Sequence, residues 1–257
     1  VFEYTFRAMG RGSIGVPAAG MTALPAALAD RAREAGVVIE TGEDVESIRI
    51  AGQGRIPFRT GSADADGATV ELADGSTRET DAVVVAASPP EARRLTSVES
   101  VPTEGVPNVT GWYALPAGES FETGKRILLN AANESPNAVV PMSEVAPEYA
   151  PDDRALLAAT FLGEEALERD ADALRDDVCE ALDAWFPDRD FSGLETIDVH
   201  RVRFAQFAQP PGVHADLPSV DDPDGPVTLA GDYTEWSSIQ GALESGRKAA
   251  EAAAEHL

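Results

Sequence analysis

Residues 225–253, GPVTLAGDYTEWSSIQGALESGRKAAEAA, carry the clearest structural signal in this chain. A short apolar strand over 227–230 is followed by Gly231 and Asp232, a polar turn, and an alanine-rich helix. Ser238 is expected to cap this helix, because its hydroxyl can accept a hydrogen bond from an N–H group of the first turn. A single carboxylate thus lies between a buried strand and a helix start, where its purpose needs an explanation.

The helix after Ser238 has two features that bear on ligand binding. Its apolar residues share one helical face, and they are Ile239, Ala242, Leu243, Ala249, Ala250 and Ala253. Gly241 and Gly246 lack side chains and would let another backbone approach the helix closely. The helix N-terminus offers free N–H groups and partial positive charge to an electron-rich ligand.

The composition is that of a globular protein. With 257 residues, 43% of them hydrophobic, the chain can bury one large core or two smaller ones. The sequence has no apolar run that approaches the length of a membrane span and no signal peptide at its start, so we expect a cytoplasmic protein. It opens on VFEYTFRAMG, as if within a strand, which suggests a fragment of a longer protein.

The chain is strongly acidic, with a net charge of −25 from 45 acidic and 20 basic residues. A field of this sign repels nucleic acid and anionic membranes, so neither is an expected partner. Two interpretations are open: an acidic interaction surface, or a solvated surface adapted to high salt, where screening removes most self-repulsion. The even spread of the acids along the chain favours the second, halophilic interpretation.

The first third of the chain predicts a layered α/β arrangement. The expected elements are a helix between Thr22 as N-cap and Gly36 as terminator, strands over 37–40 and 44–51, and a hairpin that turns at Asp74-Gly75. An uninterrupted apolar strand over 82–87 follows. Because nothing polar alternates along that strand, it is predicted to be buried on both faces.

Residues 96–125 are rich in Pro, Gly and Glu and are interpreted as a domain boundary, and a different kind of domain is expected from about 109 to 210. Strand-like stretches cover 109–115, 126–130, 155–162 and 196–208. A helix around Cys179 lies between the last two, which predicts an antiparallel sheet with a helix packed on it. Cys179 is the only cysteine, so it excludes an intramolecular disulfide, and without a basic neighbour in sequence it is expected in the core rather than as a catalytic thiol.

The stretch MGRGSIG formally matches a dinucleotide-binding fingerprint through Gly10, Gly12 and Gly15, with Glu40 at the end of a later predicted strand. The mechanism needs an apolar strand before the glycines and a helix that opens at once. Here charged residues interrupt the preceding strand, and the helix is delayed to Thr22. We interpret MGRGSIG as a glycine-rich turn.

Metal sites receive little support from the sequence. SADADGATVELA imitates a calcium loop through Asp64 and Asp66, but Ser62 and Ala73 stand where two of the ligands should be, so a hairpin tip explains it better. The three histidines, His200, His214 and His256, are scattered and lack the spacing of metal ligands.

Three stretches match one family in the same order. They are GMTALPAALADRAREAGVVIETGEDVESI (20–48), TDAVVVAASPPEARRL (80–95) and the closing strand, turn and helix of 227–253. Together they resemble the C-terminal half of the FAD-dependent amine oxidase superfamily, which includes phytoene desaturases and protoporphyrinogen oxidases. The ending is the most specific part, because family members close with a strand, Gly-Asp or Gly-Glu, a loop, and a helix of Gly-Ala-x-x-Ser-Gly type.

The resemblance implies a fold class of α/β plus α+β, the C-terminal part of a two-domain, Rossmann-like FAD-binding flavoprotein with an inserted antiparallel-sheet substrate domain. Residues 20–95 and 225–257 would belong to the FAD-binding domain, and 1–19 and 96–224 to the substrate domain. The family's upstream dinucleotide fingerprint, which grips the FAD pyrophosphate, has no convincing counterpart here. The 257 residues alone are therefore expected to bind FAD weakly or not at all.

The resemblance also assigns cofactor contacts. It implies that Asp232, after Gly231, accepts a hydrogen bond from a ribityl hydroxyl of FAD, and that Ile239 N–H faces a flavin carbonyl at the helix start capped by Ser238. Val45 resembles the family position whose backbone meets the adenine. Each residue also has a purely structural interpretation. Asp232 would only cap a turn, and Val45 would be an ordinary buried strand residue.

The function that the resemblance implies is an FAD-dependent oxidoreductase, or its C-terminal part, which removes hydride from an apolar or amine substrate in the manner of a carotenoid desaturase, protoporphyrinogen oxidase or amine oxidase. The aromatic residues Trp112, Tyr113, Phe204 and Phe207 would either line the substrate pocket or pack in the core. Two alternatives are a non-catalytic scaffold that kept the fold without flavin, and a nicotinamide-binding protein that uses Gly10 to Gly15. The sequence assigns no catalytic residue and no oligomeric state.

Overall fold

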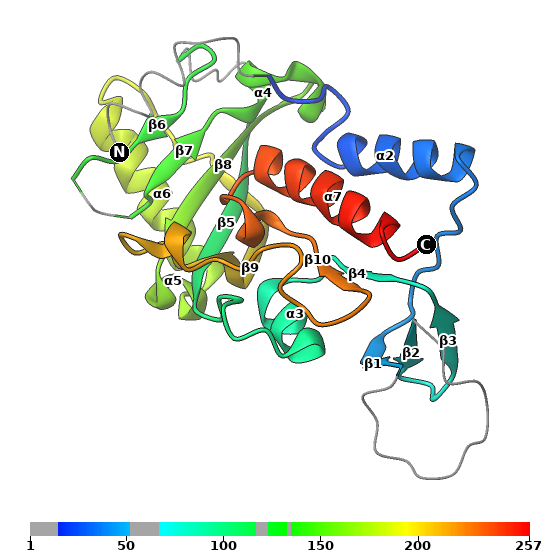
Figure 1. Ribbon diagram of the computed structural model, residues 1–257. Helices are drawn as coiled ribbons and strands as arrows, with labels where there is room; N and C mark the ends of the chain where they lie inside the picture. Colours follow the sequence, from blue (N-terminus) through cyan, green and yellow to red (C-terminus); the bar gives the residue numbers. More distant parts are fainter. Residues whose placement is uncertain (1–14, 52–66, 117–122, 133–134) are drawn as a thin grey trace. The chain divides into compact units, whose positions relative to one another are not determined.

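The computed structural model describes residues 15–51, 67–116, 123–132 and 135–257. The chain divides into two compact units, which we call the first unit (Val1–Ile39 and Pro107–Arg203) and the second unit (Glu40–Val106 and Phe204–Leu257). Each unit is described separately, and Figure 1 gives the element labels.

The first unit is built on an antiparallel sheet with the strand order β6-β7-β8-β5-β9. Its strands are β5 (Gly105–Pro116), β6 (Leu128–Leu129), β7 (Ala138–Val140), β8 (Arg154–Leu162) and β9 (Glu195–Phe207). The longest described pairing joins β5 to β8, from Asn108 opposite Leu162 to Pro116 opposite Arg154. The four strand-like stretches expected in this region overlap β5, β6, β8 and β9, so the predicted antiparallel sheet is confirmed.

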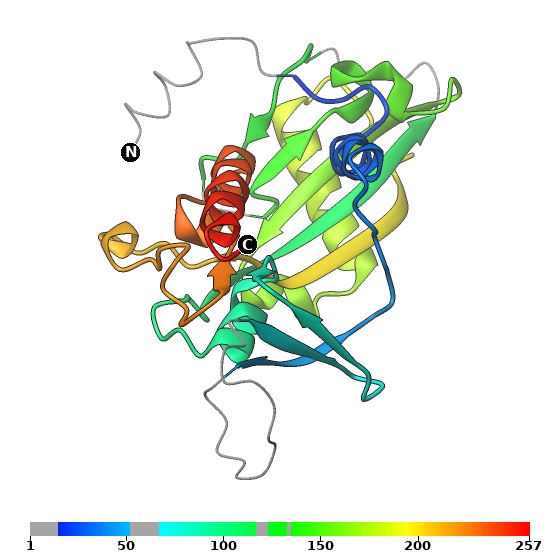
Figure 2. The same ribbon diagram turned by 45° about the vertical axis from the view of Figure 1, so that its right-hand side comes forward.

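One long helix packs against this sheet (Figure 2). The helices of the first unit are α2 (Ala23–Glu34), α4 (Met142–Val145), α5 (Glu164–Glu168), α6 (Ala171–Trp185) and the 3-10 turn η1 (Pro147–Tyr149). Asp170 caps α6 by accepting a hydrogen bond from Ala173 N–H at 2.7 Å. Leu174, Val178 and Leu182 of α6 join the strand residues in one buried core, and their i, i+4, i+8 spacing explains why this helix was readable from sequence.

Cys179 belongs to the same helix and packs against the same core. Its Sγ lies 3.7 Å from the main-chain oxygen of Phe191. Burial raises the pKa of the Cys179 thiol, which makes it a poor nucleophile. The prediction of a core cysteine is confirmed.

Helix α2 has the predicted bounds, but it does not begin as predicted. Thr22 has helical dihedral angles (φ −64°, ψ −18°) and its side chain makes no capping hydrogen bond, whereas a side-chain N-cap needs an extended backbone. The predicted cap was therefore wrong. Gly36, at φ +91°, ends the helix as expected, because glycine adopts this left-handed conformation without strain.

The strand expected over 37–40 is not formed. Val38 is 81% exposed, and no described strand pairs with this segment. A β-strand exists only through hydrogen bonds to a neighbour, so an apolar, β-branched run is not sufficient by itself.

The second unit contains a three-stranded antiparallel sheet of β1 (Val45–Ile50), β2 (Ala68–Leu72) and β3 (Thr77–Thr80), in that order. The turn between β2 and β3 matches the prediction. Gly75 has φ +83°, and Ser76 N–H donates to Asp74 Oδ1 at 2.8 Å. Aspartate and glycine therefore each meet a specific need of the turn, a local acceptor and a positive φ.

A second sheet of this unit is parallel and has two strands, β4 (Val83–Val85) and β10 (Val227–Leu229). Its helices are α3 (Pro89–Thr96), α7 (Ile239–Ala254) and the 3-10 turns η2 (Val213–Ala215) and η3 (Asp232–Thr234). The core gathers Val85, Ala92, Val101, Phe207, Val227, Leu229 and Tyr233. Strand β4 is shorter than predicted and Val84 is 42% exposed, so burial on both faces was wrong for the described chain, in which β10 is the only strand beside β4.

The structure is a mixed α/β arrangement with an antiparallel and a parallel part. The contact-based division differs from the domain boundaries expected from sequence: residues 20–39 group with the first unit, and 96–106 and 204–224 group with the second. Helix α2 lies within residues 20–39 and has no buried residue. Its pattern of exposure therefore does not show to which of the two parts it belongs. The domain assignment stays a prediction.

Candidate functional site

The candidate site begins at the carboxyl end of β10, where the chain leaves the parallel sheet. All three residues of β10 are buried, and Ala230 N–H still donates to Val85 O of β4 at 2.9 Å. Gly231 then continues in an extended conformation, and a Cβ on it would lie 2.2 Å from Cε1 of Tyr233. Glycine is required there because the tyrosine ring lies directly against the backbone.

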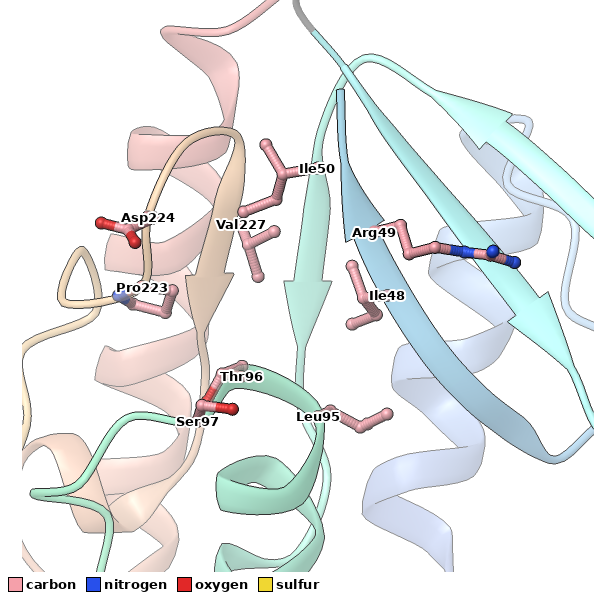
Figure 3. Close-up of a pocket in the computed structure, with 9 residues that line it drawn as sticks. All are labelled: Ile48, Arg49, Ile50, Leu95, Thr96, Ser97, Pro223, Asp224 and Val227. Atoms are coloured by element: carbon pink, nitrogen blue, oxygen red, sulfur yellow. The ribbon is translucent and has the colours of Figure 1, made fainter. Parts of the chain in front are cut away.

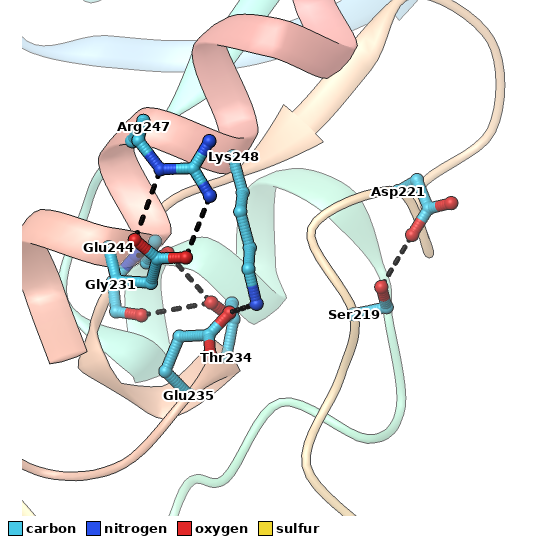
Figure 4. A network of polar contacts seen from close by, with 9 residues as sticks. Ser219, Asp221, Gly231, Thr234, Glu235, Glu244, Arg247 and Lys248 are labelled. Atoms are coloured by element: carbon cyan, nitrogen blue, oxygen red, sulfur yellow. Dashed lines mark hydrogen bonds and ion pairs between the residues drawn. The ribbon is translucent and has the colours of Figure 1, made fainter.

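A buried serine, Ser245, connects this turn to α7, and Figure 4 shows Gly231 and Thr234 of the turn. Ser245 Oγ accepts a hydrogen bond from Gly231 N–H at 2.9 Å and lies 2.7 Å from Thr234 Oγ1. Thr234 Oγ1 in turn donates to Gly231 O at 3.1 Å. Ser245 is fully buried, and every polar atom in this triangle has a partner, so the turn and the helix are held as one piece.

The start of α7 has the predicted cap. Ser238 is extended (φ −173°, ψ 162°), and its side chain accepts a hydrogen bond from Gly241 N–H at 2.9 Å. Ala242 N–H makes the first intrahelical bond, to Ser238 O at 3.0 Å. As in the first turn of any helix, Ile239 N–H therefore has no acceptor within the helix and is available to a ligand.

The buried face of α7 is not the apolar face expected from sequence. Gly241, Ser245 and Ala249 are buried, whereas Ile239 and Leu243 are 50% and 49% exposed. The helix lies against η3, β10 and β4, and only small residues allow that approach. A Cβ on Gly241 would lie 2.1 Å from Trp236 O, which confirms the predicted close contact there, while Gly246 has nothing within 4 Å of its Cβ position.

Asp232 opens η3 and is half-buried. Its main-chain oxygen accepts a hydrogen bond from Glu235 N–H at 3.2 Å, but its carboxylate has no hydrogen bond or ion pair with the residues that the structure describes. Glu235, three residues later, differs in this respect, because it pairs with Lys248 Nζ at 2.5 Å. The alternative in which the Asp232 side chain caps a turn therefore has no matching contact in the described chain.

The Asp232 carboxylate also acts on its neighbour. Burial raises the pKa of Tyr233 to about 12, and the negative charge of Asp232 adds to the effect. The Tyr233 hydroxyl donates to Ala230 O at 3.4 Å. The tyrosine is therefore neutral at physiological pH and serves to pack the turn rather than to transfer protons.

Val45 lies on a separate element of the same unit, at the start of β1. It is half-buried, and the register of β1 against β2 shifts between Val45 and Ser47. The structure thus places Gly231, Asp232, Ser238 and Ile239 on one continuous turn and helix start, with Val45 elsewhere in the unit. Sequence reasoning included Ser245 only as the serine of the Gly-Ala-x-x-Ser-Gly helix type and missed its contact with Gly231.

A cavity of about 390 Å³ opens in the second unit between β1, the end of α3 and the segment before β10 (Figure 3). Its lining is mixed, with the apolar side chains of Ile48, Ile50, Leu95 and Val227 beside the polar residues Arg49, Thr96, Ser97 and Asp224. The cavity lies at the amino end of β10, whereas Asp232 follows the carboxyl end. Ligands of parallel α/β sheets bind outside the carboxyl ends of the strands, so the turn at Gly231 is the stronger candidate.

Other residues singled out in the sequence fall into three groups. Gly10, Gly12 and the calcium-like Asp64 and Asp66 lie outside the described residues. Tyr113 and Phe207 are fully buried in the two cores, and Trp112 and Phe204 are half-buried. The described part of the chain brings together no group of three or more His, Cys, Asp or Glu side chains that could hold a metal.

None of the helices in the described ranges has the length and apolar character that crossing a lipid bilayer requires.

Known proteins with the same fold are larger than this chain. An oxidoreductase from Methanosarcina mazei is similar to it with a TM-score of 0.67 and 16% identity, covering 91% of this chain and 54% of its own. Cyclohexylamine oxidase from Brevibacterium oxydans follows with a TM-score of 0.63, 19% identity and coverages of 92% and 52%. Putrescine oxidase bound to putrescine has a TM-score of 0.61, 18% identity and coverages of 92% and 53%.

At these identities the likeness shows the fold alone, and this chain spans about half the length of the three structures. No curated protein sequence matches the chain at a significant level. The family model of flavin containing amine oxidoreductases, in contrast, matches residues 2–254, almost the whole chain. The chain therefore belongs to the flavin containing amine oxidoreductase family.

Proposed function

We propose that this protein is an FAD-dependent oxidoreductase that removes hydride from an apolar or amine substrate. The observation that carries the proposal is the Asp232 carboxylate, half-buried and without a partner in the described chain, between a buried strand and the first turn of a capped helix. The family membership supports a flavin as the ligand.

The residues at the site have the chemistry that FAD needs. A carboxylate accepts hydrogen bonds only, which suits the hydroxyl groups of a ribityl chain, so Asp232 would hold that part of the cofactor. A free N–H at a helix start donates, which suits a flavin carbonyl, so Ile239 N–H would face the pyrimidine end of the ring. Gly231 and Ser238 would shape the turn and cap the helix, and the Val45 backbone would meet the adenine.

Flavin, when bound, supplies the hydride acceptor of the reaction. The chain's own residues bind and orient it: Ser245 and Ser238 fix the turn and the helix start, and the buried strand β10 holds both in place. No residue of the chain is needed as acid or base in this proposal. The protein would act by positioning the reactants and excluding water.

Residues 20–95 and 225–257 are proposed to form the cofactor-binding part, and 1–19 and 96–224 the substrate-binding part. An amine is supported by the names of two similar structures, cyclohexylamine oxidase and putrescine oxidase. We further propose that the acidic surface is adapted to high salt and that the protein is cytoplasmic.

The deciding experiment measures the FAD dissociation constant of Asp232→Ala, Asp232→Glu and the parent, in the protein as its gene encodes it and at fixed high salt. Asp232→Ala removes a charge-assisted hydrogen bond of about 1.5–3 kcal/mol, so the dissociation constant should rise roughly ten- to a hundredfold. Asp232→Glu should lose less, because it keeps the carboxylate.

Glu235→Ala is the matched control, because it removes a nearby carboxylate that already has a partner in Lys248. It should leave the FAD affinity within about twofold of the parent, since the ion pair is partly exposed. Unchanged affinity in Asp232→Ala would remove the cofactor contact proposed here. A parent protein that shows no flavin absorbance and binds no FAD would favour a scaffold protein or a nicotinamide-binding protein.

A further inference from the structure

Arg94, on α3, makes an unusual contact with the main chain of β1. Its guanidinium donates to two successive carbonyl oxygens, Val45 O at 2.8 Å and Glu46 O at 2.7 Å. Successive carbonyls of a regular strand point to opposite sides. Both can meet one guanidinium here because the register shift between Val45 and Ser47 makes Glu46 the extra residue of a bulge.

The hydrogen bonds on either side of Val45 set the direction of its own polar groups. Asp44 O accepts a hydrogen bond from Ala73 N–H at 2.9 Å, which turns this carbonyl towards β2. In a trans peptide the N–H points opposite to the C=O, so Val45 N–H points away from β2. Strand β1 is at the edge of its three-stranded sheet, so no strand of that sheet pairs with the side of β1 that faces away from β2. The Val45 carbonyl, which accepts from Arg94, points to the same open edge as the Val45 N–H.

Arg94 is itself held in place. Its Nε donates to both carboxylate oxygens of Glu91, at 3.0 and 2.9 Å, and a second nitrogen of the guanidinium also contacts Glu91. These bonds lower the pKa of the Glu91 carboxyl, so the pair is ionised at neutral pH. A guanidinium fixed on one side by a carboxylate presents its remaining donors in a defined plane.

We propose that Arg94 is a positioning residue for the adenine end of FAD, which it serves by holding the Val45 peptide with its N–H directed at the open edge of β1. The inference rests on the proposed function, in which the Val45 backbone meets the adenine. A base edge offers a ring nitrogen to the Val45 N–H and an amino group to the Val45 carbonyl. A carbonyl oxygen has two lone pairs, so Val45 O can accept from the adenine amino group while it keeps its bond to Arg94.

The test compares Arg94→Met with Arg93→Met, again by FAD dissociation constant in the protein as its gene encodes it. Methionine keeps much of the side-chain stem and removes the donors. Arg93 is on the same helix, but it bonds Val101 O and Glu99 instead of β1. Arg94→Met should weaken FAD binding by up to roughly tenfold, the effect of losing one neutral hydrogen bond between the adenine and the Val45 peptide, and Arg93→Met should not. Arg94→Lys, which keeps the positive charge and one donor nitrogen but not the planar guanidinium, should recover part of the loss.

Amide hydrogen exchange separates positioning from general destabilisation. In the parent, FAD should slow the hydrogen exchange of Val45 N–H, and in Arg94→Met it should no longer do so. In both proteins FAD should still slow the exchange of the amides at the start of α7. Equal losses of affinity in the Arg94 and Arg93 variants, or no FAD protection of Val45 in the parent, would overturn the inference. If Asp232→Ala weakens FAD binding and Arg94→Met does not, the inference fails and the proposed function stands; a parent that binds no FAD refutes both.

Discussion

Helices α6 and α7 are close in length, 15 and 16 residues, and each is capped by a side chain, yet they use opposite packing strategies. Helix α6 buries Leu174, Val178 and Leu182. Helix α7 buries Gly241, Ser245 and Ala249, and it leaves Ile239 and Leu243 half exposed. The large side chains of α6 contribute to a core, whereas the small residues of α7 allow a polar turn to approach the helix axis.

The difference teaches that an apolar face on a helix does not identify what the helix binds. In α6 the apolar face and the buried face coincide, because a helix on a sheet gains most by burying large side chains. In α7 the buried face contains a serine that receives the Gly231 N–H. Helix α7 is therefore placed by a hydrogen bond from the Gly231 turn and by close approach at Gly241.

The largest expected effect on the free energy of unfolding comes from a leucine-to-alanine substitution in α6, which is compared with the same substitution in α7. Leu174→Ala leaves a cavity in the core of the first unit and should lower the free energy of unfolding by about 2–5 kcal/mol. Leu243→Ala, on the exposed face of α7, should change it by less than about 0.5 kcal/mol. Urea unfolding followed by circular dichroism at fixed high salt measures both. A large loss for Leu243→Ala would break the comparison, because it would mean that this face of α7 is covered in the protein.

A pair of glycines within α7 sharpens the comparison. Gly241→Ala places a methyl group 2.1 Å from Trp236 O, and since the neighbour is backbone, we expect a loss of about 1–3 kcal/mol. Gly246→Ala meets nothing within 4 Å and should gain about 0.5–1 kcal/mol from the better helix propensity of alanine. Thermal melts of the two variants beside the parent test this opposition. A stabilised Gly241→Ala would show that α7 does not need close approach.

The features that were predictable from sequence are those that depend on local chemistry. The hairpin at Asp74-Gly75 needed a positive φ and a local acceptor, and the cap at Ser238 needed a hydroxyl before a helix. The α6 pattern repeated apolar residues at helical spacing. Each can be recognised from residues a few positions apart in the sequence.

Apart from the cap at Thr22, which is local, the features that sequence reasoning missed depend on neighbours far along the chain. The run 37–40 has the composition of a strand but no described partner, and Val84 is exposed because β4 has one neighbouring strand. At the site, Asp232 could be singled out from its position between strand and helix. The partners of Ser245 and Arg94 could not be predicted, because Gly231 is 14 residues from Ser245 and Val45 is 49 residues from Arg94.

The smallest expected effect concerns the tyrosines beneath the two helices. Tyr113 lies in the core that α6 covers, and Tyr233 belongs to η3, against which α7 packs. Burial raises the pKa of each from 10 in the unfolded chain to about 12. Because the folded state holds the phenol proton more tightly, the stabilisation is complete below about pH 10 and is lost as the pH rises towards 12.

The two tyrosines should respond differently to removal of the hydroxyl. At about pH 11, each tyrosine should lower the free energy of unfolding of the parent by roughly 1.4 kcal/mol relative to neutral pH. Replacing either tyrosine with phenylalanine should remove the contribution of that tyrosine to the loss.

At neutral pH, Tyr113→Phe should be neutral or slightly stabilising, because the buried Tyr113 hydroxyl has no hydrogen-bond partner in the described chain. Tyr233→Phe loses a long bond to Ala230 O and should cost up to about 1 kcal/mol. Urea unfolding at the two pH values resolves all four numbers. If Tyr113→Phe kept the full alkaline loss of the parent, the core under α6 would not be as dry as its packing implies, and the contrast with the polar face of α7 would weaken.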